Sequence, residues 1–319
     1  MSERRTYLSH VEALAPATSA NLGAGFDVFG VALEALHDKV SVDVTDEKGI
    51  KLYVEGEGAS SIPTDPEKNT AGVVAKAILN AFNIKCGLVL KIEKGIKPGS
   101  GLGSSAASAA ATATALNEAF RLKLSQYDLI KFAALGEIAS AGAPHADNVS
   151  SSIMGFFTVV FSNDPVEVLQ IQLPYNVEFV IAIPELTLNT LIARSVIPKQ
   201  VKLSDSVFNI ANASAFIIGA MRGNIALMGK AMKDFIAEPY RAPLIPGLNE
   251  VKSKALEAGA LGVAISGAGP SVLALVDSEH GVERNVAKAM KEGFKENNVK
   301  SDVIITKPGP GAKILKREP

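Results

Sequence analysis

The chain has 319 residues, of which 47% are hydrophobic and 20% charged, a composition typical of globular proteins. This length favours two domains of roughly 100–200 residues each. The net charge of −1 and the lack of a long basic run argue against nucleic acid or an anionic membrane as the main partner. No segment has the roughly 18–20 consecutive apolar residues that cross a membrane. With one cysteine, Cys86, an internal disulfide is excluded, and we expect a cytoplasmic protein.

The first half of the chain contains short strand-like runs and longer runs with helical periodicity. Asn69 is a favourable N-cap for one predicted helix, and Ser125 with Asp128 has the spacing of a capping box at the start of another. Two β-rich runs flank an N-D-P turn at 163–165 and predict a hairpin. In chain order, the expected elements are strands at 11–15, 40–44, 51–55 and 87–93, helices at 69–82, 104–120 and 125–140, and hairpin strands at 153–161 and 166–173.

The second half mixes paired helices with strands in an order that is not a regular alternation. Such an order favours the α+β class over a βαβ repeat. We place the domain boundary in the polar stretch near the hairpin, which predicts an N-terminal domain at 1–168 and a C-terminal domain at 169–319. The expected elements are strands at 178–183, 261–265, 272–276 and 302–305, and helices at 207–222, 225–236, 249–258 and 282–296.

The sequence K-P-G-S-G-L-G-S-S-A-A at 97–107 is the strongest functional pattern. Alternating glycines let backbone N–H groups approach a ligand, and the helix that follows begins with unpaired N–H groups and the positive end of its dipole. This combination predicts a phosphate site, although a plain glycine-rich turn capped by serine is the alternative. The spacing is neither that of a Walker A loop nor that of a dinucleotide fingerprint. The candidate residues are Lys97, Pro98, Gly99, Ser100, Gly101, Leu102, Gly103, Ser104, Ser105, Ala106 and Ala107.

Two other segments are rich in small residues. In A-P-A-T-S-A-N-L-G-A-G-F-D-V-F-G at 15–30, Asn21 and Asp27 lie across a glycine turn and offer an amide and a carboxylate to a cationic amino group and a hydroxyl. The alternative is a turn stabilised by these side chains themselves. In I-S-G-A-G-P-S-V-L-A-L-V at 265–276, a loop between two strands exposes several N–H groups, so we expect it either to contact a phosphate or simply to connect the strands.

Glu137 is the candidate metal ligand. On a helical wheel it falls on the apolar stripe with Leu129, where a carboxylate is costly unless it is paired or bound to a metal. A divalent ion beside Ser105 would satisfy it, and Mg²⁺ prefers such oxygen ligands together with phosphate. The alternative is a salt bridge, for which Lys131 and Arg194 are the candidate partners.

A polar segment, P-H-A-D-N-V-S-S-S at 144–152, precedes a predicted strand. Asp147 is a candidate general base and Asn148 a candidate for orienting a hydroxyl, whereas a lone histidine such as His145 is commonly a structural hydrogen-bonding group. Arg194 and Arg241 present planar forks that match a carboxylate, and both lie in the half of the chain without the glycine-rich loop. We therefore expect them to bind a substrate carboxylate across a cleft, the alternative being ordinary surface charges.

These segments together resemble the GHMP kinase superfamily, which is named after galactokinase, homoserine kinase, mevalonate kinase and phosphomevalonate kinase. K-P-G-S-G-L-G-S-S-A-A is similar to its phosphate loop, and I-S-G-A-G-P-S-V-L-A-L to its C-terminal glycine motif. A-P-A-T-S-A-N-L-G-A-G-F-D-V-F-G-V-A-L resembles the homoserine kinase branch. The resemblance implies an N-terminal domain like the second domain of ribosomal protein S5, a ferredoxin-like C-terminal domain, and an active site in the cleft between them. It also implies ATP and Mg²⁺ as cofactors, a homodimer, and transfer of phosphate from ATP to the side-chain hydroxyl of L-homoserine in threonine biosynthesis.

The resemblance further implies how the substrate is bound. Asn21, Asp27 and His145 would bind its amino end. Arg194 and Arg241 would bind its carboxylate.

It also implies the nucleotide and metal ligands. Ser105 and Glu137 would hold Mg²⁺, Thr190 would lie near the transferred phosphate, and the segment around Asn69 would line the adenine pocket.

The catalytic step leaves alternatives open. Asn148 would contact the reacting hydroxyl, while Asp147 either acts as a base or only positions the substrate. Phosphoryl transfer proceeds without a strong base where charge stabilisation dominates. Two other functions also remain: a related kinase for another small alcohol, such as mevalonate or shikimate, and a non-catalytic protein that binds a nucleotide or an amino acid as a regulator.

Overall fold

The computed structural model describes residues 7–141 and 146–319. Its larger sheet has seven strands. Five of them follow the order β11-β1-β2-β4-β3, and β5 pairs with β2 on one side and with β6 on the other. The pair β3–β4 is parallel and is connected through helix α1, whereas the other pairs are antiparallel. The strands are β1 (His10–Asn21), β2 (Gly25–Thr45), β3 (Gly49–Gly56), β4 (Gly87–Lys94), β5 (Phe157–Asn163), β6 (Val166–Ile171) and β11 (Lys313–Glu318).

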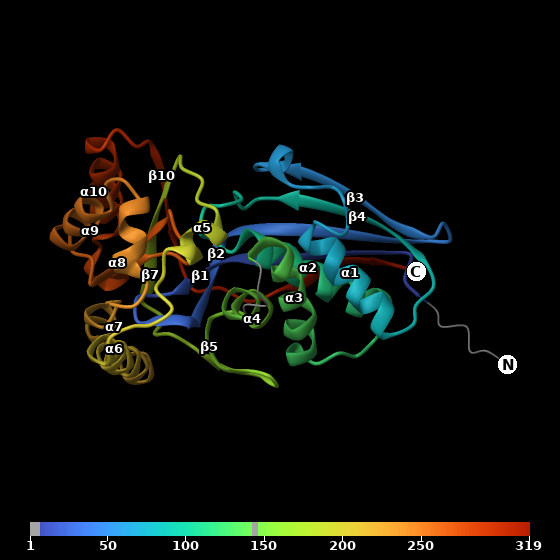
Figure 1. Cartoon of the computed structure of the whole chain (residues 1–319), viewed down its shortest axis with the longest axis horizontal. Coiled ribbons are helices and arrows are strands. Elements are labelled where there is room, and N and C mark those ends of the chain that lie inside the picture. Colours follow the sequence, from blue (N-terminus) through green and yellow to red (C-terminus); the bar gives the residue numbers. More distant parts are fainter. Residues whose placement is uncertain (1–6, 142–145) are drawn as a thin grey trace.

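Four helices accompany this sheet: α1 (Thr70–Ala81), α2 (Ser104–Ala119), α3 (Gln126–Ala141) and α4 (Asp147–Met154). Helix α2 consists almost entirely of alanine, serine and threonine, and most of it is buried. Its small side chains let it pack closely against β1 and β2 while it contacts α1, α3 and α4 on its other sides. The sequence therefore places a close-packed helix directly behind the glycine-rich loop (Figure 1).

The second sheet has four antiparallel strands in the order β10-β7-β9-β8. Numbered along the chain, this is the order 4-1-3-2 of a ferredoxin-like unit. Helices α9 and α10 lie together at the end of the molecule opposite the C-terminus (Figure 1). The elements are β7 (Val177–Pro184), β8 (Gly262–Ile265), β9 (Val272–Asp277), β10 (Ser301–Thr306), α5 (Thr190–Ser195), α6 (Leu203–Arg222), α7 (Ile225–Lys230), α8 (Glu238–Arg241), α9 (Leu248–Glu257) and α10 (Glu283–Glu296), with short 3₁₀ turns η1 (Ala59–Ser61), η2 (Ala242–Leu244) and η3 (Ser278–His280).

The expected α+β class with two units is confirmed, as are most of the expected elements. The N-cap is as predicted, because the Asn69 side chain accepts a hydrogen bond from the backbone N–H of Ala71. The capping box is also present: Ser125 donates to Asp128, and the backbone N–H of Asp128 donates back to Ser125. The predicted domain boundary after residue 168 lies inside β6, and β11 returns from the C-terminal end of the chain to the first sheet.

Three expectations about elements were wrong. The strand expected from 153 begins only at Phe157, because the preceding serine-rich segment forms α4, which ends at Gly155 with φ 82°. The helix expected at 225–236 ends at Lys230, since the carboxylate of Asp234 accepts backbone hydrogen bonds from a turn that follows it. Strands β1 and β2 extend much further than expected and include most of the segment expected to be a loop around Asn21. Among the described residues, no helix is long and apolar enough to span a membrane.

Candidate functional site

The three segments rich in small residues meet in the structure, although they lie far apart in the sequence. The backbone N–H of Thr18 donates to the carbonyl of Leu102 over 3.1 Å. The hydroxyl of Ser266 donates to the carbonyl of Gly101 over 2.8 Å, and the N–H of Gly267 donates to the carbonyl of Ala20 over 3.1 Å. The predicted phosphate loop is therefore held between the N-terminal hairpin and the C-terminal glycine loop.

The phosphate loop itself needs glycine at two positions. Gly101 has φ 82°, and a Cβ added to it would lie 2.5 Å from the carbonyl oxygen of Ser266. Gly103 has φ 63° and is the N-cap of α2, and a Cβ there would lie 1.9 Å from the hydroxyl oxygen of Thr18. Both the left-handed backbone and the lack of space exclude a side chain. The loop thus brings backbone N–H groups to the N-terminus of a sixteen-residue helix, which favours an anion.

Ser105 and Glu137 come together next to this loop, as expected for the proposed metal ligands. The Ser105 hydroxyl, one residue into α2, donates to Glu137 Oε2 over 3.2 Å. Glu137 lies on α3 and is only 7% exposed. A hydroxyl and a carboxylate oxygen at the N-terminus of a helix are a donor set that fits Mg²⁺ when phosphate oxygens supply further ligands. Arg194 does not form the salt bridge with Glu137 that the sequence analysis left open.

Arg194 instead pairs with Asp27. Its Nη1 and Nη2 atoms donate to the two carboxylate oxygens over 2.7 and 2.5 Å, so that the pair is bidentate. This hydrogen bonding raises the pKa of Arg194 above its usual value. Asp27 has φ 58°, and both side chains remain partly exposed. Phe26 lies beside this pair, with the guanidinium groups of Arg194 and Arg241 at 5.2 and 5.4 Å from its ring centre.

Arg241 is the more buried of these two arginines and is 4% exposed. Its Nε donates to the carbonyl of Ala193 over 3.1 Å, and its Nη1 donates to the carbonyl of Gly267 over 2.9 Å. Burial lowers the pKa of the Arg241 guanidinium, since the charged form loses hydration there. Asn21 donates to the same Gly267 carbonyl over 2.8 Å, and its Oδ1 accepts from the N–H of Asp27. Asn21 therefore shapes the turn that places Asp27.

The remaining predicted residues lie at the start of α4 and α5. Asp147 and Asn148 begin α4, where Asp147 Oδ1 accepts from the backbone N–H of Asn148 over 2.8 Å. The Asn148 Oδ1 accepts from the Thr18 hydroxyl over 2.7 Å. Thr190 is the first residue of α5 and is exposed. His145 lies outside the described residues.

One cavity of about 650 Å³ brings the predicted residues together. It is lined by both halves of the chain and by almost every predicted site residue that the structure describes. The exceptions are Leu102, Ala106 and Ala107, which pack in the hydrophobic core behind the loop. The predicted residues that line it are Asn21, Asp27, Asn69, Lys97, Pro98, Gly99, Ser100, Gly101, Gly103, Ser104, Ser105, Glu137, Asp147, Asn148, Thr190, Arg194 and Arg241.

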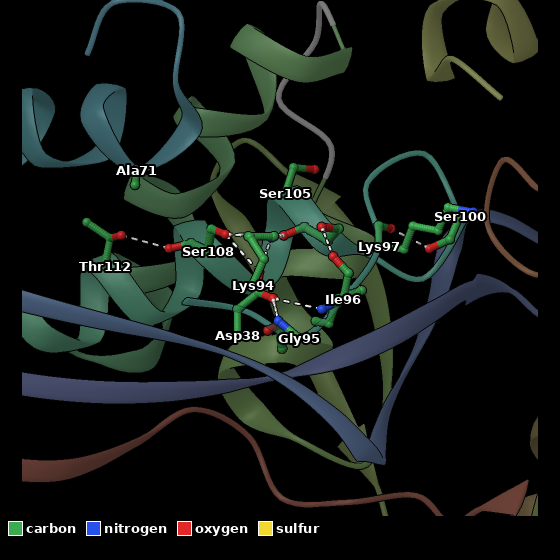
Figure 2. Close-up of polar contacts among 12 residues, drawn as sticks. Asp38, Ala71, Lys94, Gly95, Ile96, Lys97, Ser100, Ser105, Ser108 and Thr112 are labelled. Atoms are coloured by element: carbon green, nitrogen blue, oxygen red, sulfur yellow. Dashed lines mark hydrogen bonds and ion pairs between the residues drawn. The ribbon is translucent and has the colours of Figure 1, made fainter. Parts of the chain in front are cut away.

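Sequence reasoning missed a buried ion pair at this cavity. Asp38 and Lys94 lie on the neighbouring strands β2 and β4 and contact both ends of the phosphate loop, at Ile96 and at Ser104 (Figure 2). The alternation of buried residues was the available signal. Val40 and Val42 point into the core, so Asp38 does as well, and the same two-residue period carries the buried face of β4 to Lys94.

Comparison with known proteins agrees with the fold. Residues 69–156 match the family model for the GHMP kinases N terminal domain, and residues 216–296 match that for the GHMP kinases C terminal region. The arrangement of a glycine-rich loop before an alanine-rich helix, between two further glycine-containing segments, is thus that of a GHMP kinase.

The relatives narrow this class. A homoserine kinase from Methanococcus vannielii is 47% identical over 88% of this chain and 93% of its own length. One from Methanocella arvoryzae is 44% identical over 95% of this chain and 97% of its own length. The crystal structure of homoserine kinase from Cytophaga hutchinsonii matches with a TM-score of 0.91 at 37% identity, covering 96% of this chain and 98% of that one. The chain belongs to the homoserine kinase family of the GHMP kinases.

Proposed function

We propose that this protein transfers the γ-phosphoryl group of ATP to the side-chain hydroxyl of L-homoserine, which gives ADP and O-phospho-L-homoserine for threonine biosynthesis. The observation that carries the proposal is the link between the two sides of the cavity. Ser266 binds Gly101 in the phosphate loop, and the carbonyl of the next residue, Gly267, accepts from Arg241. A phosphate site and a cationic site are thus fixed relative to each other through two adjacent residues.

The Asp27–Arg194 pair supports an amino acid as the substrate. A zwitterion carries both of the charges that this pair presents: its ammonium group matches Asp27, and its carboxylate matches the bidentate fork of Arg194. The substrate would enter by exchanging partners with the two side chains, which their partial exposure permits. Mevalonate and shikimate carry a carboxylate but no ammonium group, so Asp27 would lose its partner with either of them and its charge would be left unpaired.

The phosphate chain would lie against the N–H groups of the glycine-rich loop and of the first turn of α2. Ser105 and Glu137 would hold Mg²⁺, which neutralises charge on the phosphate oxygens when it is bound. Thr190, from the second half of the chain, also lines the cavity and would contact the transferred group. These groups stabilise the charge that develops during transfer, and for this reaction they supply most of the catalysis.

Asn148 would orient the homoserine hydroxyl, whose oxygen forms the new bond to the γ-phosphorus as the bond to the ADP oxygen breaks. Its Oδ1 accepts from the Thr18 hydroxyl and its Nδ2 donates to Asp147 Oδ1 over 3.3 Å, and these two contacts fix the amide at the cavity that it lines. Asp147 positions Asn148 through the backbone hydrogen bond at the start of α4. We infer that the hydroxyl proton passes to an oxygen of the transferred phosphoryl group or to solvent, and that Asp147 is not a required base.

The test is a coupled assay of ADP release with homoserine, serine, threonine, mevalonate and shikimate as acceptors. We expect turnover with homoserine to exceed that with the others and to require Mg²⁺. Faster turnover with mevalonate or shikimate would contradict the amino-acid site, and ATP binding without turnover on any acceptor would favour a regulator. In line with the single cysteine, we propose that the enzyme works in the cytoplasm. The homodimer that the family resemblance implies stays a prediction. Sedimentation velocity, which measures the oligomeric state in solution, tests it.

A further inference from the structure

A buried charged cluster contacts both ends of the phosphate loop and has no role in the chemistry described so far. Asp38, on β2, is fully buried, and Lys94, the last residue of β4, is 6% exposed. Their side chains form an ion pair that is shown in Figure 2. Charged side chains are rarely buried without a specific reason, because each loses its hydration.

The hydrogen bonds of Lys94 are directed at the protein. Its Nζ donates to Asp38 Oδ2, to the backbone carbonyl of Ser104 over 2.8 Å and to the hydroxyl of Ser108 over 2.9 Å. An ammonium group has three donors, and these three contacts use them all. Although Lys94 lines the cavity, it is therefore arranged to hold α2 in place and not to bind a phosphate directly.

Asp38 makes the matching contacts with the other end of the loop. Its Oδ1 accepts from the backbone N–H groups of Gly95 and Ile96 over 3.1 and 3.2 Å, and its Oδ2 accepts from Ser108 over 2.8 Å. The Ser104 hydroxyl then donates to the carbonyl of Ile96 over 2.8 Å. The residue before the loop and the residue after it are thus joined through one cluster (Figure 2).

The electrostatic balance of this pair argues against a purely stabilising role. Burial raises the pKa of Asp38 and lowers that of Lys94, since it disfavours the charged form of each group. A buried ion pair commonly contributes no more stability than apolar side chains of the same size. What apolar side chains cannot do is bind a backbone N–H group on one side and a helix carbonyl on the other.

We propose that Asp38 and Lys94 are positioning residues for the nucleotide. They fix the entry of the glycine-rich loop at Ile96 and its exit at Ser104, and thereby set the geometry in which the loop presents its N–H groups to the phosphates. The identity of the ligand rests on the proposed function.

A matched control is present on the same two strands. Lys39 and Glu93 are the residues adjacent to Asp38 and Lys94, they pair at 2.7 Å, and they are partly exposed on the opposite face of the sheet. Comparing Lys94→Met with Glu93→Gln therefore separates loss of the loop contacts from loss of an ion pair between β2 and β4. Ser108→Ala is a milder second variant, because it removes one hydroxyl from the cluster and retains the ion pair.

The experiment measures the dissociation constant of MgATP by calorimetry and the KM values for ATP and homoserine, at a temperature where circular dichroism shows each variant to be folded. For Lys94→Met we expect the dissociation constant and KM for ATP to rise at least about tenfold, while KM for homoserine changes by less than about twofold. Ser108→Ala should give a smaller rise in the same direction. Glu93→Gln should match the wild type.

A merely structural role would give a different result, since a smaller folded fraction lowers the apparent kcat and leaves both KM values unchanged. The inference is overturned if folded Lys94→Met binds MgATP as the wild type does. If Lys94→Met does not fold, Ser108→Ala decides, and unchanged MgATP affinity in that variant overturns the inference. A wild-type protein that fails to bind MgATP would instead refute the proposed function itself, and this inference with it.

Discussion

The two sides of the cavity are built in different ways. On the nucleotide side, the loop is formed by backbone groups and is held by buried side chains whose hydrogen bonds are already made within the protein. On the substrate side, Asp27 and Arg194 are 31% and 38% exposed and hold each other by two hydrogen bonds. The first side is preorganised, whereas the second has charges that would change partners when the proposed substrate binds.

This difference matches what each side has to recognise. A phosphate chain is a strong anion with oxygens in every direction, so a fixed set of N–H groups suits it and costs no rearrangement on binding. A small amino acid must be distinguished from compounds of similar size by the placement of its two charges. Changes on the nucleotide side should therefore act on ATP and be large, while those on the substrate side should act on homoserine alone.

The largest effect is expected from Gly101→Ala. The new Cβ would lie 2.5 Å from the Ser266 carbonyl oxygen and would strain a backbone with φ 82°, so that the loop must move away from the C-terminal glycine loop. We expect kcat/KM for ATP to fall by at least about a hundredfold. Steady-state kinetics with ATP as the varied substrate measure this effect.

Gly223→Ala is the control for this substitution. Gly223 has φ 68° and ends α6, and a Cβ there meets no atom within 4 Å. It should cost roughly 1 kcal/mol of stability through backbone strain alone and leave the kinetics unchanged. Equal losses of kcat/KM in the two variants would show that the effect at Gly101 comes from general destabilisation.

A smaller and more selective effect is expected from Arg194→Met. The substitution keeps an unbranched side chain that replaces the aliphatic part of arginine, and it removes the bidentate donors. We expect KM for homoserine to rise by about 10–100-fold, the equivalent of one or two charge-assisted hydrogen bonds, with KM for ATP unchanged. Arg222→Met, at the exposed C-terminal end of α6, is the control. A parallel rise in both KM values would contradict the separation of the two sides.

The glycine-rich loop of the proposed nucleotide side, and the helix that follows it, were predicted from the sequence. Its residues are contiguous at 97–107, and the physical requirement that produces them, glycine at positive φ directly before a helix, is local. The expected proximity of Ser105 and Glu137 is confirmed, because a carboxylate on the apolar stripe of a helix needs a polar partner nearby. Patterns of this kind depend on neighbouring residues alone, so they can be recognised in the sequence before the structure is known.

The substrate side and the contacts that support the loop were harder to predict. Asp27 and Arg194 are 167 residues apart, and nothing in the sequence near either one indicates that they pair. Asp38 was predictable in principle from the two-residue period of β2, but its polar neighbours His37 and Lys39 make the segment look like a solvent-exposed end. Helix α4 occupies most of the polar segment expected before a strand, because its three serines, which are buried in the structure, do not show the apolar pattern of a buried helix face.

Asp147→Asn tests whether the region between the two sides takes part in the chemistry. Asn retains an oxygen that accepts from the backbone N–H of Asn148, so the start of α4 should keep its geometry. We expect kcat to remain within about tenfold of the wild type, because a loose transition state depends little on a base. Single-turnover kinetics measure the chemical step. Total loss of turnover with unchanged homoserine affinity would instead assign Asp147 the role of a base.

The smallest effect should come from a site remote from both sides. His10, at the start of β1, lies 2.7 Å from Asp43 and 3.3 Å from Glu12, and its hydrogen bond to Asp43 raises its pKa above 6.5. A pKa raised by folding stabilises the protein when the imidazole is charged, which is fully the case below the unfolded pKa and is lost as pH rises through the folded one. His10→Gln should therefore lower the free energy of unfolding by roughly 0.5 kcal/mol at about pH 5.5 and by nothing at about pH 8.5.

Urea titrations of wild type and His10→Gln at the two pH values measure this difference, and a difference that persists at the higher pH would rule out the charged imidazole as its cause. Both KM values should be unchanged, since His10 lies outside the lining of the cavity. Unchanged KM values in His10→Gln would serve as the reference for the variants on the two sides of the cavity. A loss of stability that moves neither KM shows that a selective rise in KM for ATP or for homoserine reports the geometry of one side of the cavity and not the stability of the fold.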